Sequence, residues 1–281
     1  MSITQGEFEY VRTMVRDRAG IVLEDGKEYL VEARLGPIAR EHGLPDPSAV
    51  ISQLIERPAG PLRDAIIDAL TTNETSFFRD IHPWNTLREE ILPSLIDARR
   101  ARRRIRILSG AASTGQEAYT LALILRHHFP ELAGWDVTIV GTDISRDALA
   151  KARSGTYSQL EVNRGLPAQM LQYFTQTGRD WKLRDDVRSL VEFRELNLVE
   201  AWPALGSFDL VLMRNVLIYF ETATKRDVLR RIRSVMAPDA YLFLGASETT
   251  INIDDEFEPI RIGKSTVYLL ETHPLLHTAA A

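Results

Sequence analysis

The spacing of apolar residues divides the chain into two parts of different character. Up to about Thr72, apolar residues recur three or four positions apart, which is the spacing of amphipathic helices. Turn-forming residues at 25–26, 43–47 and 58–61 separate these segments. Residues 1–72 are therefore predicted to form an all-helical domain of about three or four short helices. The apolar positions behind this prediction are Phe8, Val11, Val15, Tyr29, Leu30, Ala33, Val50, Ile51, Leu54 and Ile55.

After Arg104, short apolar runs alternate with helical segments. This alternation is typical of an α/β domain whose parallel strands are joined by right-handed helical crossovers. We expect this domain to span residues 104–275, with a tail at 276–281 and a linker helix at 73–103. The predicted strands are Ile105–Leu108, Val137–Val140, Phe208–Met213 and Tyr241–Leu244, and the predicted helices include Ala118–His128 and Lys225–Met236.

Two stretches depart from this alternation. Between about 156 and 190, turn residues and dense charge interrupt the pattern, which predicts a small subdomain inserted into the sheet. Near the end of the chain, Tyr241–Ala246 and Ser265–Leu270 have no helix between them, so we expect them to pair antiparallel at a sheet edge. A closing hairpin of this kind is common in methyltransferases and absent from dehydrogenases.

The composition limits the possible environments and partners. The chain has 281 residues, 44% of them hydrophobic and 26% charged, which is ordinary for a globular protein. It has no cysteine, so disulfides and a thiolate zinc site are excluded, and no apolar stretch approaches the roughly 20 residues that span a bilayer. Because its start lacks a basic and apolar signal region, we expect a cytoplasmic protein without membrane insertion. A formal net charge of −5 disfavours nucleic acid as a partner.

A loop rich in small residues follows the first predicted strand. The segment from Ile105 to Gly115 is read as a strand that leads through small residues into a helix, so the backbone there can approach a ligand closely. A P-loop would need Lys and then Ser or Thr after Gly115, where this chain has Gln116 and Glu117. The glycines do not match the dinucleotide fingerprint, and an acidic residue at the helix start would repel a pyrophosphate. The ligand is therefore not expected to be anionic.

S-adenosylmethionine satisfies these constraints. Its ammonium and sulfonium groups are cations that Glu117 can hold, while backbone N–H groups can hold its carboxylate. Asp143 closes the next strand, at Val137–Gly141, where a carboxylate can accept two hydrogen bonds from the ribose hydroxyls. The residues alone leave a simpler alternative open, in which the glycines serve only a tight turn and Asp143 only caps a helix that begins near Ser145.

Five short motifs, spread in order over nearly the whole chain, carry a family resemblance. They are Thr72–Arg79, Ser113–Tyr119, Thr142–Ile144, Ala152–Tyr157 and Arg214–Phe220. Together they resemble the motifs of the CheR family, the methyltransferases of chemotaxis receptors. The resemblance implies a Rossmann-like S-adenosylmethionine methyltransferase sheet, an N-terminal all-helical domain and a small inserted antiparallel β-subdomain. It also implies methylation of receptor glutamates, with S-adenosylhomocysteine as the second product.

The resemblance further implies roles for individual residues. Asn73, Thr75 and Arg79 would reach the cofactor from the linker, while Glu117 would hold the methionyl amine and Asp143 the ribose. The remaining cofactor-binding positions are Gly110 in the loop, Asn197 and Leu198 near the adenine, and Met213 and Arg214 along the pocket wall. Gly110, Gln116 and Ala118 depart from the residues common in the family, but none of them removes a charge that these roles need.

Catalysis on a glutamate would depend mainly on positioning. A glutamate side chain is ionised at neutral pH, so it needs no general base to attack a methyl group. We expect Arg79 to hold the substrate carboxylate or the cofactor, and Tyr219 to order the carboxylate through its hydroxyl. A structural ion pair for Arg79 and a buried core position for Tyr219 are the alternatives.

Basic residues and histidines elsewhere have simpler interpretations. The arginine-rich run at 99–104 is interpreted as a solvated helix end. His127 and His128 end a helix and cannot face one metal ion together, so no metal site is expected. On the second helix, Lys27, Arg34 and Arg40 are predicted to form an electrostatic docking face for the receptor, with ordinary surface charge as the alternative.

The partner that the resemblance implies is the cytoplasmic domain of methyl-accepting chemoreceptors, bound by a monomer. The inserted subdomain looks shorter than in relatives that bind a C-terminal pentapeptide of the receptor, so we expect no such tether. Two other functions remain open. One is a cofactor-binding sensor that has lost transfer activity, and the other is a methyltransferase that acts on a small molecule or a nucleic acid.

Overall fold

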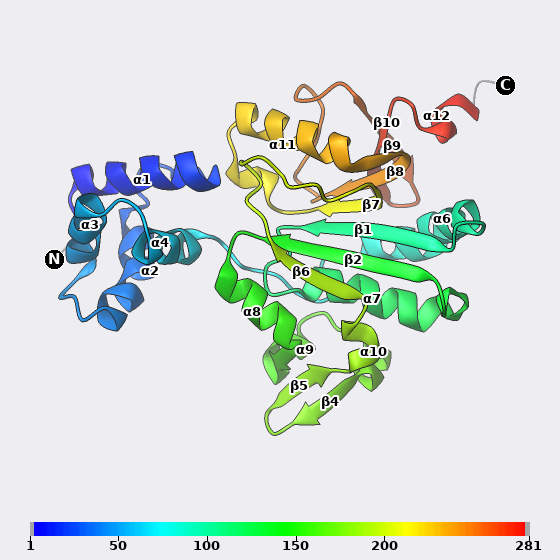
Figure 1. Cartoon of the computed structure of the whole chain (residues 1–281), viewed down its shortest axis with the longest axis horizontal. Coiled ribbons are helices and arrows are strands. Elements are labelled where there is room, and N and C mark those ends of the chain that lie inside the picture. The colour runs from blue at the N-terminus through cyan, green and yellow to red at the C-terminus, as the bar shows by residue number, and fades with distance from the viewer. Residues whose placement is uncertain (1–2, 279–281) are drawn as a thin grey trace.

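The computed structural model describes residues 3–278, and its N-terminal part is a bundle of helices (Figure 1). Thr4 and Glu7 form a capping box at the start of the first helix, and Gly20, with a φ of 72°, ends it. The side chain of Asp46 caps the third helix. The four helices described within residues 3–72 are α1 (Gln5–Ala19), α2 (Glu28–Glu41), α3 (Pro47–Glu56) and α4 (Pro61–Leu70).

The buried face of α2 differs from the expected one. The sequence pattern placed Tyr29, Leu30 and Ala33 on it, but Tyr29 is 62% exposed and Ala33 is exposed as well. Because residues 29–31 are all apolar, periodicity alone could not decide which of them faces inward. The side chains that enter the helical core from α2 are Val31, Leu35, Ile38 and Ala39.

A bent helical segment joins this bundle to the sheet. After an irregular stretch at 73–80, the segment comprises α5 (Ile81–Thr86), a π-helical turn (Leu87–Ile91) and α6 (Leu92–Arg99). Its buried apolar side chains, Trp84 among them, belong to the core of the α/β part. The division of the chain into a linker at 73–103 and domains on either side stays a prediction.

Arg99, at the end of α6, is buried and not solvated as expected. It is 2% exposed, and it donates from Nε to Asp209 (2.7 Å) and from Nη1 to Asp239 (2.6 Å). Asp239 and Asp209 raise the pKa of Arg99, and the hydrogen bond from Arg99 lowers the pKa of Asp239. The interpretation as a solvated helix end is therefore wrong for Arg99, although Arg100 and the residues at 102–104 are exposed.

The α/β part is built on one sheet with helices on both faces (Figure 1), as predicted. In the described chain, seven strands lie in the order β6-β2-β1-β7-β8-β10-β9, and the first five are parallel. Neighbouring residues of a strand enter opposite cores, so that Ile107 packs with α7 and Leu108 with α11. The parallel strands are β1 (Arg104–Gly110), β2 (Asp136–Asp143), β6 (Val191–Glu195), β7 (Phe208–Met213) and β8 (Met236–Leu244), and the crossover helices are α7 (Gln116–His128), α8 (Arg146–Ser154) and α11 (Thr222–Val235).

The sheet closes with an antiparallel hairpin that has one more strand than expected. As predicted, β10 (Ser265–Leu270) pairs antiparallel with β8. The expectation that β10 forms the sheet edge is wrong, because β9 (Phe257–Ile262) pairs with its other side. The sequence pattern missed β9 because Pro259 and exposed charged side chains interrupt its apolar residues, which an edge strand tolerates.

A small antiparallel sheet of order β3-β5-β4 forms the predicted inserted subdomain, seen below α8 in Figure 1. Tyr157 and Phe174 pack edge-on against Phe77 of the linker, with ring centroids 5.0 and 5.7 Å away. Of the predicted tail, residues 279–281 lie outside the described part of the chain. The elements of the subdomain are β3 (Thr156–Ser158), α9 (Gln159–Asn163), β4 (Phe174–Thr177), β5 (Asp180–Leu183) and α10 (Asp185–Arg188). The last element of the described chain is α12 (Pro274–Thr278).

Gly165→Ala is expected to destabilise the junction between the linker and this subdomain. Gly165 has a φ of +93°, and a Cβ there would stand 2.1 Å from the carbonyl oxygen of Phe77. We expect the free energy of unfolding, measured by denaturant titration, to fall by about 2–4 kcal/mol. Gly178→Ala is the matched control, because Gly178 has a φ of +64° but no heavy atom within 4 Å of its Cβ position. It should lose only about 1–2 kcal/mol, and equal losses would contradict the contact with Phe77.

Candidate active site

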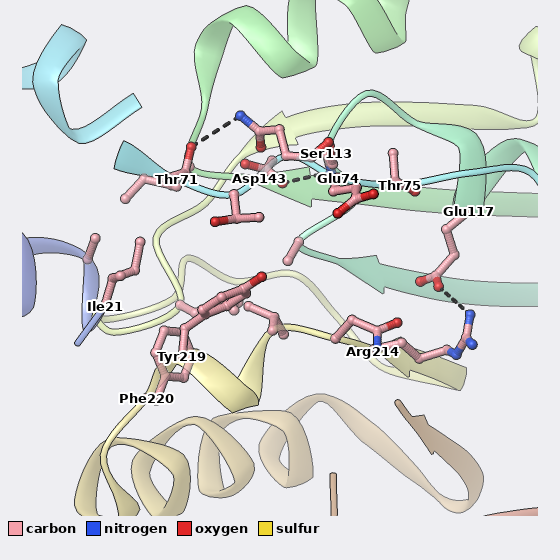
Figure 2. A pocket seen from close by; sticks show the side chains of 18 of the residues that line it. Ile21, Thr71, Glu74, Thr75, Ser113, Glu117, Asp143, Arg214, Tyr219 and Phe220 are labelled. Atoms are coloured by element: carbon pink, nitrogen blue, oxygen red, sulfur yellow. Dashed lines mark hydrogen bonds and ion pairs between the residues drawn. The ribbon is translucent and has the colours of Figure 1, made fainter. Parts of the chain in front are cut away.

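A cavity opens at the carboxyl ends of the parallel strands, where α/β sheets place their ligands (Figure 2). It encloses about 880 Å³, counting the part that is open to solvent. Its wall comes from the loops after β1, β2, β6 and β7, from the linker around 71–79, and from the end of α1. Segments that are far apart in the sequence thus meet around one pocket.

One end of the cavity holds a cluster of charges around the buried side chain of Arg214. Arg214, directly after β7, donates from Nη1 to Glu117 and from Nη2 to Asp80, each over 2.9 Å (Figure 2 shows the first pair). Its guanidinium also lies over the ring of Trp84, 5.4 Å from the centroid. The hydroxyl of Ser109 donates to the other oxygen of Glu117 over 3.2 Å. Arg214 therefore ties the sheet to α7 and to the linker.

The charges of this cluster are only partly compensated. Burial raises the pKa of Glu117, while Arg214 lowers it by its charge and its hydrogen bond. Nε of Arg214 is buried and has no hydrogen-bond partner among the described residues. A ligand that brings a cation to Glu117 and an acceptor to Arg214 would satisfy both groups. The ammonium and carboxylate of an amino acid supply this combination.

Asp143 closes β2 elsewhere in the cavity and is held by backbone donors. Its Oδ2 accepts from the N–H of Ser113 (2.7 Å) and its Oδ1 from the N–H of Ser145 (2.9 Å). The side chain of Ser145, and not that of Asp143, caps α8. Burial raises the pKa of Asp143, and hydrogen bonds from the backbone, mainly from Ser145 and Ser113, lower it. Because a carboxylate has about four lone-pair sites, about two remain for hydroxyls in the cavity.

Hydrogen bonds to the α/β part hold the linker over the cavity. The hydroxyl of Ser113 donates to the carbonyl oxygen of Asn73 over 2.9 Å. Further along, the N–H of Phe78 donates to the hydroxyl of Thr120 on α7 over 3.1 Å. These contacts explain how the linker motif, which includes Thr75, comes to line a pocket in the sheet domain.

Arg79 stands between two strained backbone positions. Phe78 and Asp80 have φ values of 50° and 56°, a left-handed conformation that residues other than glycine seldom adopt. Arg79 lines the cavity, and its Nη1 donates to the carbonyl oxygen of Glu74 over 3.1 Å. Among the described residues, this guanidinium forms its hydrogen bond with a carbonyl group and no ion pair within 4 Å, although its charge contributes to lowering the pKa of Glu74.

The carboxyl end of α1 forms a wall of the cavity that sequence reasoning missed. Gly20 turns the chain after the helix, so that Ala19 and Ile21 line the cavity. The side-chain amide of Asn197 donates to the carbonyl oxygen of Arg18 over 2.7 Å and joins this wall to the loop after β6. Apolar residues beside a helix cap carry no ligand signal in a sequence, so nothing in the pattern could have shown them.

Tyr219 follows β7 in a short 3-10 turn (Leu217–Tyr219), and its ring projects into the cavity (Figure 2). Its carbonyl oxygen accepts from the N–H of Val22, which fixes the backbone of the turn against the chain after α1. The side chain is half-buried, and its hydroxyl has no hydrogen-bond partner within residues 3–278. The hydroxyl is thus available to a ligand.

The structure brings most of the predicted site residues to this cavity. Gly110 and Met213 do not line it; a Cβ on Gly110 would stand 2.3 Å from Cε of Met213, so these two residues pack on each other beside the loop. Asp80, which shares Arg214 with Glu117, was not predicted, although its place directly after Arg79 offered a signal. The predicted residues that line the cavity are Asn73, Thr75, Arg79, Glu117, Asp143, Asn197, Leu198, Arg214 and Tyr219.

The predicted docking residues lie apart from the cavity, in and beside α2. Arg34 donates from Nη1 to the carbonyl oxygens of Ala69 (2.8 Å) and Thr71 (2.9 Å), so its guanidinium fastens the end of α4. Lys27 precedes the helix and is half-buried, whereas Arg40 in its last turn is exposed. The three residues therefore differ in how freely they can meet a partner.

The described chain contains neither a cluster of metal ligands nor a membrane helix. Within residues 3–278, no three His, Asp or Glu side chains are grouped so that they could hold a metal ion. None of the helices described there is both long and apolar enough to cross a membrane.

Comparisons with known proteins agree with this fold and site, which define an S-adenosylmethionine-dependent methyltransferase. Residues 73–266 match the model "CheR methyltransferase, SAM binding domain", and residues 6–71 match "CheR methyltransferase, all-alpha domain". The chain therefore belongs to the CheR methyltransferase family. It is 40% identical to chemotaxis protein methyltransferase 1 of Pseudomonas aeruginosa, over 95% of this chain and 99% of that relative. It is 36% identical to chemotaxis protein methyltransferase Cher2 of Pseudomonas putida, again over 95% and 99%.

S-adenosylmethionine is the cofactor of this family domain, and the residues of the cavity fit it. Buried Glu117 and the unpartnered Nε of Arg214 complement an ammonium group and a carboxylate. The free lone pairs of Asp143 complement a ribose diol. The cavity thus offers different chemistry to the two polar ends of the cofactor.

Proposed function

We propose that this protein transfers the methyl group of S-adenosylmethionine to glutamate side chains in the cytoplasmic domain of chemoreceptors. The observation that carries the proposal is the cavity with Glu117 and Arg214 in one part, Asp143 in another, and the free hydroxyl of Tyr219 on its wall. The names of the relatives, which match over 95% of this chain, support a role in chemotaxis. The product would be a glutamate methyl ester.

The cofactor would be held at several points. Glu117 would bind the methionyl ammonium and Nε of Arg214 the carboxylate, while Asp143 would accept hydrogen bonds from the ribose. Asn73, Thr75 and Arg79 would enclose it from the linker, and Asn197 and Leu198 would lie near the adenine together with Ile21. These are the residues that the cavity brings together.

The residues of the chain would then act mainly by positioning. When bound, S-adenosylmethionine supplies a methyl group on a cationic sulfur, which an ionised carboxylate can attack. The substrate glutamate is ionised at neutral pH, so neither Tyr219 nor Arg79 needs to remove a proton. The hydroxyl of Tyr219 would donate to the substrate carboxylate and aim it, and Arg79 would assist from the linker. The linker, which hydrogen bonds to Ser113 and Thr120 hold over the cavity, would help to exclude water.

Tyr219→Phe is expected to lower turnover with little effect on cofactor affinity. The substitution keeps the ring and removes only a hydroxyl that has no partner within the described chain. Because hydrogen bonds to charged groups contribute about 1.5–3 kcal/mol, kcat should fall about 10- to 150-fold. Calorimetry should show a Kd for S-adenosylmethionine within about twofold of the wild type. An equal loss of affinity and turnover would instead show that Tyr219 is structural.

We further propose how the enzyme meets its partner. Lys27, Arg34 and Arg40 would form a basic docking face, with Arg40 as its most accessible member and Arg34 held largely by α4. The protein would act as a cytoplasmic monomer and would not need a C-terminal pentapeptide tether, because the strands of its subdomain are short.

A labelling experiment tests the proposed function. The protein is incubated with S-adenosylmethionine that carries a radioactive methyl group and with a receptor cytoplasmic fragment encoded in the same genome. Label should appear on the fragment and be released as methanol by alkali, as expected for an ester. Alkali-stable label would contradict the proposal. Cofactor binding without any transfer would also contradict it and would favour a sensor.

A further inference from the structure

The carboxylate of Glu248 is buried and is held by four backbone donors. Glu248 lies in the turn after β8 and is 8% exposed. Its Oε2 accepts from the N–H groups of Gly245 (2.6 Å) and Asn215 (2.7 Å). Its Oε1 accepts from those of Val216 (2.8 Å) and Ile218 (3.3 Å). In the part of the chain that the structure describes, it forms no ion pair with a Lys or Arg side chain.

Three of these donors belong to the loop that joins Arg214 to Tyr219. β7 and β8 are parallel neighbours, with Met213 opposite Leu244, so the chain leaves both strands at the same edge. The loop has little regular structure of its own, because Asn215 has a φ of 60° and only one 3-10 turn follows. Glu248 therefore provides partners for N–H groups that would otherwise lack them beside a buried strand.

Glu248 is itself firmly placed. Its N–H donates to the carbonyl oxygen of Gly245 over 3.0 Å, and its carbonyl oxygen accepts from the hydroxyl of Tyr268, which is buried on β10, over 3.1 Å. A Cβ on Gly245 would stand 2.6 Å from Oε2 of Glu248 and 2.8 Å from Nδ2 of Asn215. These two side chains can therefore pack against the backbone at position 245 only because the residue there is glycine. The turn, the carboxylate and the loop are packed as one unit.

The position of the Tyr219 side chain depends on the backbone of this loop more than the position of the Arg214 side chain does. The guanidinium of Arg214 is held by Glu117 and Asp80, whereas the hydroxyl of Tyr219 has no partner within the described residues. The position of the Tyr219 ring therefore follows from its backbone. We infer that Glu248 is a positioning residue for methyl transfer, which acts by fixing the loop that carries Tyr219. The inference deepens the proposed function and rests on it.

Glu248→Gln tests this role in the full-length protein with the receptor fragment as substrate. Glutamine has only one acceptor oxygen, so two of the four N–H groups would face an NH₂ donor. We expect kcat to fall at least about tenfold, with a Kd for S-adenosylmethionine within about twofold of the wild type. Glu258→Gln, the same change at an exposed position of β9, is the control and should leave kcat unchanged. A merely structural Glu248 would lower the melting temperature and leave kcat, measured well below it, at its wild-type value.

A double-mutant cycle shows whether Glu248 acts through Tyr219. In the Tyr219→Phe background, Glu248→Gln should reduce kcat little further, because both changes disable the same hydroxyl. Losses that multiply, or full kcat in Glu248→Gln, would overturn the inference. If the glutamine variant does not fold, Gly245→Ala replaces it, because the added methyl group crowds the same carboxylate. The same fall in kcat is then expected, and full kcat would overturn the inference. A wild-type protein that methylates no receptor would contradict the proposed function and, with it, this inference.

Discussion

Arg214→Met is expected to lower kcat/KM about 10- to 150-fold, since a hydrogen bond to a charged group contributes about 1.5–3 kcal/mol. Because it removes one partner of a buried ion pair, it should also destabilise the fold by about 3–5 kcal/mol. The side chains of Arg214 and Glu117 are 1% and 14% exposed, so the carboxylate that remains has little access to water. The variant also loses the donor proposed for the methionyl carboxylate, and its affinity for S-adenosylmethionine should fall as well. Steady-state kinetics with the receptor fragment and calorimetry with the cofactor measure the two losses.

The pH dependence of stability separates a lost charge partner from lost packing in this variant. Burial already raises the pKa of Glu117, and without Arg214 nothing of comparable charge lowers it. The native state then holds a proton at pH values where the unfolded state has released it, so the free energy of unfolding should fall as pH rises through that interval. The double variant Glu117→Gln with Arg214→Met should lack this fall. Identical pH profiles for the two variants would contradict the account.

An exposed ion pair provides the control for Arg214. Arg146 pairs with Glu195 over 2.9 Å, but the two side chains are 67% and 51% exposed. Such pairs contribute little because water screens them. Arg146→Met should therefore leave kcat/KM close to the wild-type value, and a large loss in this variant would show that removal of any arginine impairs the enzyme.

Asp143→Asn is expected to weaken S-adenosylmethionine binding about 100-fold, because hydrogen bonds to a charged group contribute about 1.5–3 kcal/mol each. The amide has one acceptor oxygen, whereas the carboxylate serves the N–H groups of Ser113 and Ser145 and still has lone pairs for the ribose. Calorimetry measures the change in Kd. At saturating cofactor kcat should change much less, which is the reverse of the pattern expected for Tyr219→Phe.

Glu195→Gln is the matched control for Asp143→Asn. Glu195 stands opposite Asp143 in the register of β6 and β2, but its side chain is exposed and outside the cavity. Its substitution should leave cofactor affinity unchanged. Similar affinities for Asp143→Asn and the wild type, differing by less than about threefold, would contradict the proposed ribose contact.

The central strands could be predicted because they are buried on both faces. Every residue of β7 is buried, so its apolar run, which only Asp209 interrupts, coincides with the strand. The edge strand β9 buries few of its side chains and contains Pro259, so its sequence carries no comparable signal. The burial of Arg99 could not be predicted either, because it depends on Asp209 and Asp239, which lie more than a hundred residues away in the sequence.

The site could be predicted where a residue combines a chemical type with a fixed place in a motif. Glu117 at a helix start and Asp143 at a strand end are residues of this kind, and both line the cavity. Ile21 and Glu248 could not be found in this way, because their roles arise only when α1 and β8 pack beside the loop after β7. A glycine in a loop indicates that another group packs closely against the backbone, but the sequence does not tell whether that group is a ligand or a side chain. At Gly110 it is the side chain of Met213.

The chemical identity of the methylated product tests the central claim most directly. The receptor fragment is treated with the protein and with S-adenosylmethionine carrying a carbon-13 methyl group, and the product is examined by NMR. The account predicts a methyl resonance at the shift of an ester O-methyl group, which disappears after alkali and is missing when the fragment's glutamates are replaced by alanine. A methyl resonance on nitrogen or sulfur, or an ester signal that persists without those glutamates, would contradict it.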